Sequence, residues 1–184
     1  KLCIGVELII FYIDKNLILF SYCKQKRFFM NKLIIWNKGI QPEAIDILEK
    51  DGGMIVSPTK VGYIVVTSDK KGLERKFRAK QRNSNKPGVV LCGSLEQLKE
   101  LADMTPEIEK FYEEHWNDDI LLGCILPWKK SGLKYIPNDG SEELMMDRRK
   151  TSCFVIRFGT PGEKIVAELW RKHRKLSFAS SANP

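Results

Sequence analysis

The sequence predicts one α/β domain in which helices flank a twisted, mixed sheet. Short apolar, β-branched runs alternate with runs of helical period from residue 30 onward. The 184 residues are 43% hydrophobic and 29% charged, a balance that supports one core of ordinary size. No internal repeat, low-complexity tract or linker interrupts this pattern, so we expect a single domain.

The strands are expected where apolar runs are bounded by turn residues. In chain order these runs are residues 32–36, 54–56, 63–66, 89–92, 120–126, 153–158 and 176–179. The run at 120–126 is apolar except for Gly123, which is typical of a strand in the centre of a sheet. Turn residues dominate 129–140 and predict a loop there.

Helices are expected between most of these strands, where apolar residues recur at helical spacing. They cover residues 42–48, 70–80, 94–101, 105–116 and 163–173. Pro42 suits the first turn of a helix, and Ser94 and Thr105 are N-cap residues, the latter followed by Pro106. These signals predict where three of the helices begin.

The two ends of the chain differ from the region between them. Residues 1–29 hold two apolar runs, 6–13 and 17–20, which are far shorter than the ~20 residues that span a bilayer. No signal-peptide cleavage site follows these runs, and the alternation of strand and helix runs begins only at Met30. We therefore expect residues 1–29 to be an extension outside the domain. Residues 30–184 are expected to be the domain, incomplete at its C-terminus because the chain stops directly after a motif.

The cysteines bear on compartment and on metal binding. Five cysteines are an odd number, and none forms a CxxC pair. This pattern disfavours both a disulfide framework and a zinc site. Reduced thiols are typical of a cytoplasmic protein, so we expect a cytoplasmic location, no metal site and no membrane partner.

Charge is concentrated in three segments of the chain. The formal net charge is +8 and the isoelectric point is about 9.2, which favours a polyanionic partner. Residues 69–88 and 148–175 are strongly basic, whereas residues 96–119 are strongly acidic. The basic segments are either solvated helix faces or two parts of one phosphate site, with the acidic helices on the far side. The motifs that they contain favour the shared site.

Four short motifs occur at or near the predicted strands. They are residues 57–63 (Ser-Pro-Thr-Lys-Val-Gly-Tyr), 80–82 (Lys-Gln-Arg) with Lys86-Pro87 beyond, 152–157 (Ser-Cys-Phe-Val-Ile-Arg) and 180–183 (Ser-Ser-Ala-Asn). In this order and spacing they resemble the YrdC-like family, the threonylcarbamoyl-adenylate synthases. The resemblance covers roughly residues 54–184 and implies the same α/β fold with the motifs at one concave face.

The resemblance implies an ATP-dependent nucleotidyltransferase. Such an enzyme joins L-threonine, bicarbonate and ATP into threonylcarbamoyl-AMP and releases pyrophosphate, as a step toward N6-threonylcarbamoyladenosine in tRNA. ATP is then a substrate that carries Mg²⁺ with it. No covalent enzyme intermediate is required, so the protein has to hold polyanions together and stabilise charge on the α-phosphate.

The resemblance also assigns residues to the nucleotide. Lys80 and Arg82 are the expected catalytic pair, because they offer an ammonium point charge and a bidentate guanidinium fork to the phosphates. Both are also expected to bind the nucleotide. The other expected nucleotide- and phosphate-binding residues are Arg157, Ser181 and Asn183.

Thr59 and Tyr63 are the expected substrate-binding residues, in a segment that departs from the family pattern. Lys60 stands where the family has an acidic residue, and Val61 stands where it has a second threonine. The glycine that follows the tyrosine in the family is replaced by Ile64. The identity of the amino-acid substrate is therefore open.

A non-catalytic function is the alternative. A module of the same fold could use the basic surface to bind double-stranded RNA or tRNA, and the altered segment at 57–63 favours it. Each motif residue also has a plainer interpretation: Thr59 as a turn hydroxyl, Lys80 and Arg82 as surface cations, and Ser181 and Asn183 as turn formers before Pro184. Arg157 is harder to explain in this way, because a charge in an apolar strand needs a partner or a cleft.

Overall fold

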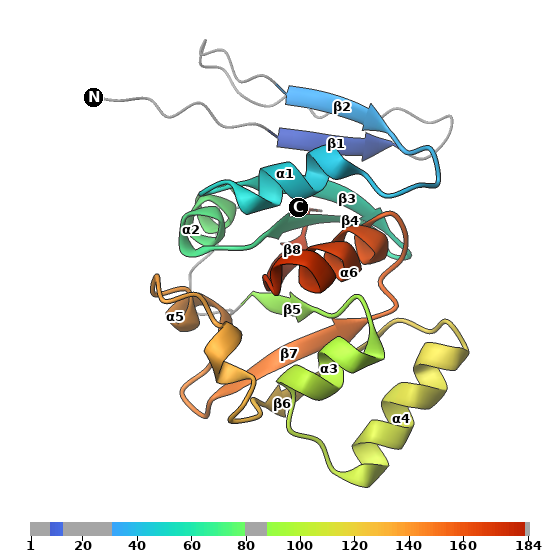
Figure 1. The fold of residues 1–184 in the computed structure, drawn as a ribbon, viewed down its shortest axis with the longest axis vertical. Helices are drawn as coiled ribbons and strands as arrows, with labels where there is room; N and C mark the ends of the chain where they lie inside the picture. Colours follow the sequence, from blue (N-terminus) through green and yellow to red (C-terminus); the bar gives the residue numbers. More distant parts are fainter. Residues whose placement is uncertain (1–7, 13–30, 80–87, 183–184) are drawn as a thin grey trace.

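A single mixed sheet organises the molecule. The computed structural model describes residues 8–12, 31–79 and 88–182. In these ranges the strands are β1 (Leu8–Tyr12), β2 (Asn31–Ile35), β3 (Met54–Thr59), β4 (Gly62–Thr67), β5 (Val89–Leu91), β6 (Leu122–Pro127), β7 (Thr151–Ile156) and β8 (Ser177–Ser181). Their order across the sheet is β2-β1-β3-β4-β8-β5-β7-β6, from the top to the bottom of Figure 1. The β1–β2, β1–β3 and β5–β7 pairs are parallel, and the others are antiparallel.

The helices are α1 (Pro42–Glu49), α2 (Lys70–Ala79), α3 (Leu95–Leu101), α4 (Pro106–Asn117), α5 (Glu142–Met145) and α6 (Gly162–His173). The five predicted helices begin within one residue of their expected starts, and the short helix α5 has no counterpart in the prediction. The Ser94 hydroxyl accepts a hydrogen bond from the Gln97 N–H at the start of α3, and the Thr105 hydroxyl accepts one from the Ile108 N–H at the start of α4. None of these helices has the length and hydropathy to cross a bilayer.

Helices α1 and α6 cover one face of the sheet. Val66 of β4 pairs with Ile55 of β3 and with Ala179 of β8, so the three side chains share that face. All three are buried against the helices. The helical residues in this layer are Ala44, Ile45, Ile47, Leu48, Ile165, Val166 and Leu169.

Helices α2, α3 and α4 contribute to the core on the opposite face. Val90 of β5 pairs with Phe154 of β7 and with Phe178 of β8, and all three are fully buried. The helical residues packed with them include Leu73, Phe77, Leu98, Leu101 and Tyr112. The α/β architecture with helices flanking a mixed sheet is therefore confirmed.

The position of strand 120–126 differs from the prediction. It forms β6 at the edge of the sheet, paired with β7 alone among the described strands, rather than a central strand. Leu126 is buried, whereas the neighbouring Ile125 is 65% exposed. An apolar run usually indicates a strand covered on both faces, but here one apolar side chain points outward, and the sequence does not distinguish the two cases.

Part of the expected N-terminal extension lies in the sheet. Leu8–Tyr12 form β1, which pairs with β3 on one side and with β2 on the other. These five residues thus belong to the sheet, because their backbone joins two of its strands. The other residues of the 1–29 segment lie outside the described ranges, and the 30–184 boundary stays a prediction.

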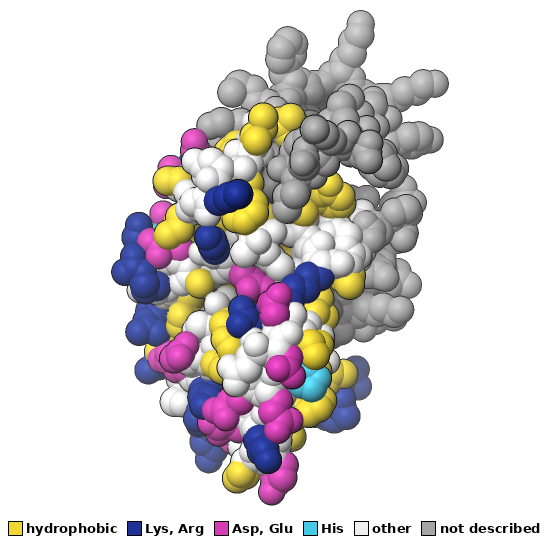
Figure 2. Space-filling model, turned by 90° about the vertical axis from the view of Figure 1, so that its right-hand side faces the viewer, with side chains coloured by type: hydrophobic (Ala, Val, Ile, Leu, Met, Phe, Trp, Pro, Cys, Tyr) yellow, Lys and Arg dark blue, Asp and Glu magenta, His cyan; other side chains and the backbone are white. Residues whose placement is uncertain are grey.

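The charged segments are arranged differently from the expectation. In the 148–175 segment, Arg157 lies just before α6, whereas Arg171 and Lys172 lie at the far end of that helix, roughly 15 Å away along a 1.5 Å rise per residue. Acidic and basic side chains are intermingled on the face shown in Figure 2. Asp119, which belongs to the acidic segment, contacts Arg157 directly, so this segment does not lie wholly on the far side from the basic residues. Residues 80–87 of the other basic segment lie outside the described ranges, so the convergence of the two basic segments stays a prediction.

Candidate functional site

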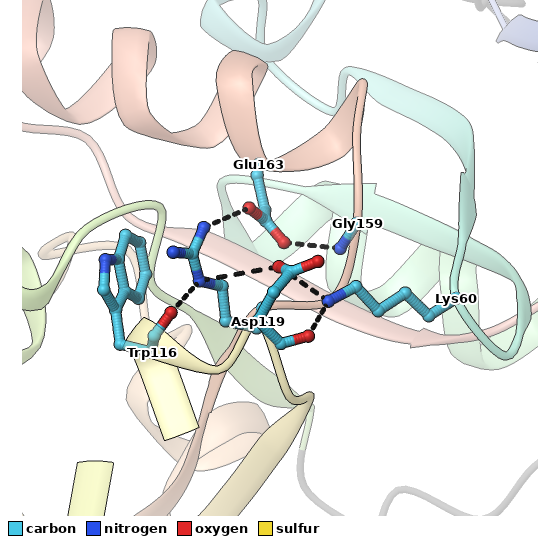
Figure 3. A network of polar contacts seen from close by, with 6 residues as sticks. Lys60, Trp116, Asp119, Gly159 and Glu163 are labelled. Atoms are coloured by element: carbon cyan, nitrogen blue, oxygen red, sulfur yellow. Dashed lines mark hydrogen bonds and ion pairs between the residues drawn. The ribbon is translucent and has the colours of Figure 1, made fainter. Parts of the chain in front are cut away.

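Three connections meet around Arg157, and Figure 3 shows the network of polar contacts between them. They are the β3–β4 turn at residues 60–61, the α4–β6 connection at 118–121 and the β7–α6 loop at 157–161. The Lys60 N–H donates a hydrogen bond of 3.0 Å to the Phe158 carbonyl, which ties the first and third of these together. Residues almost a hundred positions apart in the chain thus share one surface site.

Gly159 permits this close approach. Its φ is +110°, a conformation that side chains rarely adopt. A Cβ atom at this position would lie 3.1 Å from the Lys60 nitrogen and 3.4 Å from the Lys60 Cγ. A glycine is therefore required both by the backbone of the β7–α6 loop and by the space beside the β3–β4 turn.

Arg157 is held on several sides. Its guanidinium lies 3.9 Å from the centroid of the Trp116 ring, and its Nε donates a 2.7 Å hydrogen bond to the Trp116 carbonyl. Its Nη1 lies 3.7 Å from an oxygen of Glu163. The residue has a φ of +51°, an uncommon conformation for a non-glycine residue that is often found at functional sites. Arg157, which was expected in the strand, thus lies just beyond the end of β7, with charged and aromatic partners and a partly exposed side chain.

Asp119 and Lys60 lie over Arg157. One carboxylate oxygen of Asp119 is 2.8 Å from the Lys60 Nζ and 3.6 Å from the Arg157 Nε. The same ammonium also donates to the Asp119 carbonyl. The hydrogen bond from Lys60, reinforced by the charges of Lys60 and Arg157, lowers the pKa of the Asp119 carboxyl.

Glu163 fixes the loop beneath this cluster. One of its carboxylate oxygens accepts a 2.6 Å hydrogen bond from the Gly159 N–H, and the other faces Arg157. Its side chain is only 11% exposed. Glu163 thus couples the first turn of α6 to the loop that carries Arg157, and both of its oxygens are occupied.

Thr59 and Tyr63 flank the β3–β4 turn. The Thr59 hydroxyl donates to the Gly62 carbonyl at 2.8 Å and accepts from the Val61 N–H at 3.2 Å, so it stabilises the turn. Tyr63 is exposed, and its Cα partner across the ladder is Pro58 rather than Thr59. Successive strand residues point to opposite faces, so this register places Thr59 and Tyr63 on different faces of the sheet.

Ser181 lies beside the same turn. It pairs with Ile64 at the end of β8, and the next residue, Ala182, donates a 2.7 Å hydrogen bond from its N–H to the Tyr63 carbonyl. The first and fourth motifs are therefore neighbours in the sheet. Lys80, Arg82 and Asn183 lie outside the described residues.

Sequence reasoning missed Trp116, Asp119 and Glu163. Trp116 and Asp119 belong to the acidic segment, where nothing distinguishes them from other residues near the end of α4. Ser180 was likewise not singled out as a ligand residue, although its hydroxyl is buried without a hydrogen-bond partner in the structure. No group of three or more His, Cys, Asp and Glu side chains gathers at a possible metal site within the described ranges.

The fold and the meeting of these motifs define the class of protein. Residues 47–184 match the Sua5/YciO/YrdC family model, which is described as "Telomere recombination". The chain belongs to this family, and the resemblance to YrdC-like proteins is confirmed. No curated protein matches the chain.

Solved structures support the assignment. The hypothetical protein smu.1377c from Streptococcus mutans UA159 is 59% identical, with a TM-score of 0.80 over 84% of this chain and 61% of that one. E. coli YciO is 22% identical, with a TM-score of 0.55 over 75% of this chain and 61% of that one. P. abyssi Sua5 complexed with L-threonine is 22% identical, with a TM-score of 0.53 over 77% of this chain and 38% of that one. The chain thus spans less than two-thirds of each of these proteins.

Proposed function

We propose that the chain contributes to an ATP-dependent threonylcarbamoyl-adenylate synthase that acts in the cytoplasm on the route to modified tRNA. The observation that carries the proposal is that the first motif contacts both the fourth motif and the residue that directly follows the third. The β3–β4 turn bonds to the β7–α6 loop through Lys60 and Phe158, and β4 bonds to the β8 motif through Tyr63 and Ala182. A P. abyssi relative, Sua5, has been solved with L-threonine, which supports an amino acid as substrate.

In this proposal the protein orients and stabilises rather than forming a covalent intermediate. Threonine carbamate, formed from threonine and bicarbonate, attacks the α-phosphate of ATP, and the bond to pyrophosphate breaks. Lys80 and Arg82 offset the charge on the phosphates. Arg157, Ser181 and Asn183 would position the nucleotide. Tyr63 would border the amino acid, and Thr59, on the other face of the sheet, would hold the β3–β4 turn beside it.

Magnesium enters this proposal with ATP. Within the described ranges no cluster of three or more His, Cys, Asp and Glu groups could hold a metal ion. We assign no step to the ion.

The first test is nucleotide binding by an Arg82 variant. A charge-assisted contact contributes about 1.5–3 kcal/mol, so Arg82→Ala should weaken ATP binding roughly 10- to 100-fold in isothermal titration. Arg82→Lys should recover only part of the loss, because an ammonium lacks the bidentate fork. Arg149→Ala is the matched control, since Arg149 is an exposed arginine paired with Asp147. Unchanged ATP affinity in Arg82→Ala would remove this motif from the site.

The second test is catalysis. ATP–pyrophosphate exchange is measured with bicarbonate and a panel of amino acids, because Lys60 and Val61 leave the amino-acid substrate open. Exchange that depends on one amino acid and on bicarbonate would support the synthase. Absence of exchange with every amino acid, under conditions where ATP binds, would contradict it.

A non-catalytic RNA-binding function is the second candidate. It is favoured by the Thr59 hydroxyl, which is engaged in the β3–β4 turn, and by the net charge of +8. Binding of a short RNA duplex through many phosphates should weaken steeply as salt rises, whereas a pocket for one ATP should keep much of its affinity. Titrations of both ligands at two salt concentrations separate the two functions.

A further inference from the structure

An exposed carboxylate lies between two cations at the candidate site. The Asp119 oxygen that faces Lys60 at 2.8 Å is also the one that faces Arg157 at 3.6 Å. The Asp119 side chain is 66% exposed, whereas those of Lys60 and Arg157 are 31% and 24% exposed. The cations are therefore the more enclosed partners, and the carboxylate is the more exposed one. Figure 3 shows the contacts that join them.

The positions of the two cations do not depend on the Asp119 carboxylate. Arg157 is fixed by the Trp116 ring and carbonyl and by Glu163. Lys60 is tied through its backbone to Phe158 and through its ammonium to the Asp119 carbonyl. An exposed ion pair stabilises a protein little, so the carboxylate can leave at a small cost and the cations stay in place.

The charges of the site indicate which ligand group fits. Lys60 and Arg157 both pair with Asp119, and Arg157 also pairs with Glu163. When the Asp119 carboxylate leaves, the Glu163 carboxylate beside Arg157 is the ion-pair partner that remains for the two cations among the described residues, and one further negative charge restores the balance. One oxygen of Glu163 accepts from the Gly159 N–H and the other faces Arg157, and an ammonium next to the incoming group would lie beside two cations that repel it. The group that replaces Asp119 is thus a carboxylate without an adjacent ammonium.

We propose that Lys60 and Arg157 form a subsite for the carboxylate of a ligand, such as an acid side chain or a dicarboxylate, and that Asp119 occupies this subsite until the ligand displaces it. The proposal rests on the proposed function only in placing these residues at the ligand site. It requires neither ATP nor catalysis. It gives Lys60, the residue that departs from the family pattern, a role in selecting the ligand.

The experiment is an NMR titration of the full chain with succinate, without ATP, followed at the backbone amides of Lys60 and Gly159. Removing the internal competitor in Asp119→Asn should tighten succinate binding up to about fivefold, the equivalent of about 1 kcal/mol. Asp118→Asn is the matched control, because Asp118 is the adjacent exposed acid, and it should leave the affinity unchanged. Adding Lys60→Met to Asp119→Asn should abolish the gain.

The other probes and outcomes decide the ligand chemistry. L-Threonine should gain less than succinate from Asp119→Asn, since its carboxylate carries an adjacent ammonium. A gain for inorganic phosphate without one for succinate would overturn the assignment of a carboxylate. Equal succinate affinity in the wild type and Asp119→Asn, or an equal gain in Asp118→Asn, would overturn the subsite. If ATP binding in the Arg82 test holds while this titration fails, only the subsite is wrong.

Discussion

Helix α4 and strand β7 meet twice, and the two contacts differ in their surroundings. Within the sheet, the Tyr112 hydroxyl of α4 donates to the Phe154 carbonyl at 2.9 Å and accepts from the Cys124 N–H at 3.0 Å. Beyond the end of β7, Trp116 and Asp119 contact Arg157. In the first contact, the hydrogen bond to the Phe154 carbonyl is buried and the one from the Cys124 N–H is partly buried, whereas the second contact includes a largely exposed carboxylate.

This difference in burial indicates what each polar contact contributes to stability and to ligand binding. A buried polar group that loses its partner keeps the full cost of its desolvation, so the contact at Tyr112 should matter for folding. An exposed pair exchanges its partner for water at little cost, so the contact at Asp119 should matter for ligand choice. Burial of Tyr112 also raises the pKa of its hydroxyl, which keeps this group a neutral donor.

The largest effect is expected from Tyr112→Phe. The substitution leaves the Phe154 carbonyl and the Cys124 N–H without their shared partner, and each buried unsatisfied group costs about 1–3 kcal/mol. The free energy of unfolding, measured in urea, should fall by about 2–4 kcal/mol in total. Tyr63→Phe, at an exposed tyrosine, is the control and should change it by less than about 0.5 kcal/mol. Equal losses of unfolding free energy in Tyr112→Phe and Tyr63→Phe would contradict the distinction between the buried and the exposed contact.

A smaller loss is expected from Gly159→Ala. The new methyl group has to accept a φ of +110° and a 3.1 Å approach to the Lys60 nitrogen. Backbone strain of this kind costs about 1–3 kcal/mol. Thermal unfolding should show the loss, and the amide signals of Lys60 should shift because the β3–β4 turn is pushed away. Gly39→Ala is the control, since its Cβ would meet only the Asn37 side chain. A similar loss of stability in Gly39→Ala would contradict a special need for glycine at position 159 of the β7–α6 loop.

Most of the fold could be predicted because local signals agree with the tertiary structure. Pro42, Ser94 and Thr105 start helices in the structure as their side chains predict. The edge position of β6 could not be predicted, because Ile125 is apolar and yet exposed. The membership of Leu8–Tyr12 in the sheet depends on backbone pairing with β3, which leaves no signature in composition.

The candidate site was predictable only in part. Arg157 stood out because a cation in an apolar strand needs partners, and the structure supplies them. Its partners Trp116, Asp119 and Glu163 come from other parts of the chain, and only the fold brings them together. Lys60 appeared in the sequence as a departure from a motif, whereas its pairing with Asp119 depends on the meeting of two loops.

Helix α6 holds an ion pair whose burial is intermediate between those of the two contacts. Glu168 is nearly buried, but its partners Arg171 and Lys172 are exposed, and their hydrogen bonds lower the pKa of its carboxyl to about 2. A lowered folded-state pKa stabilises the protein above the unfolded value of about 4.3, and this stabilisation is lost as the pH falls toward 2.

The free energy of unfolding should therefore depend less on pH between about 4.5 and 2 in Glu168→Gln than in the wild type. Urea denaturation at a series of pH values measures this slope. Glu74→Gln, at an exposed glutamate of α2, is the control. Identical slopes in the wild type and Glu168→Gln would show that the exposed partners do not hold this carboxylate.

The smallest effect on stability is expected from Lys60→Met, which keeps the length of the side chain and removes its charge. The pair with Asp119 is exposed to solvent, so the free energy of unfolding should change by less than about 1 kcal/mol. The pKa of Asp119 should nevertheless rise, because the hydrogen bond from Lys60 is the largest cause of its lowering. The charge of Arg157 should keep part of the lowering of the Asp119 pKa.

An NMR titration of the Asp119 carboxyl measures the pKa shift alongside urea denaturation, with Lys110→Met as the control. A stability loss as large as that of Tyr112→Phe would mean that the exposed cluster holds the fold together. An unchanged Asp119 pKa would mean that Lys60 does not hold this carboxylate in solution.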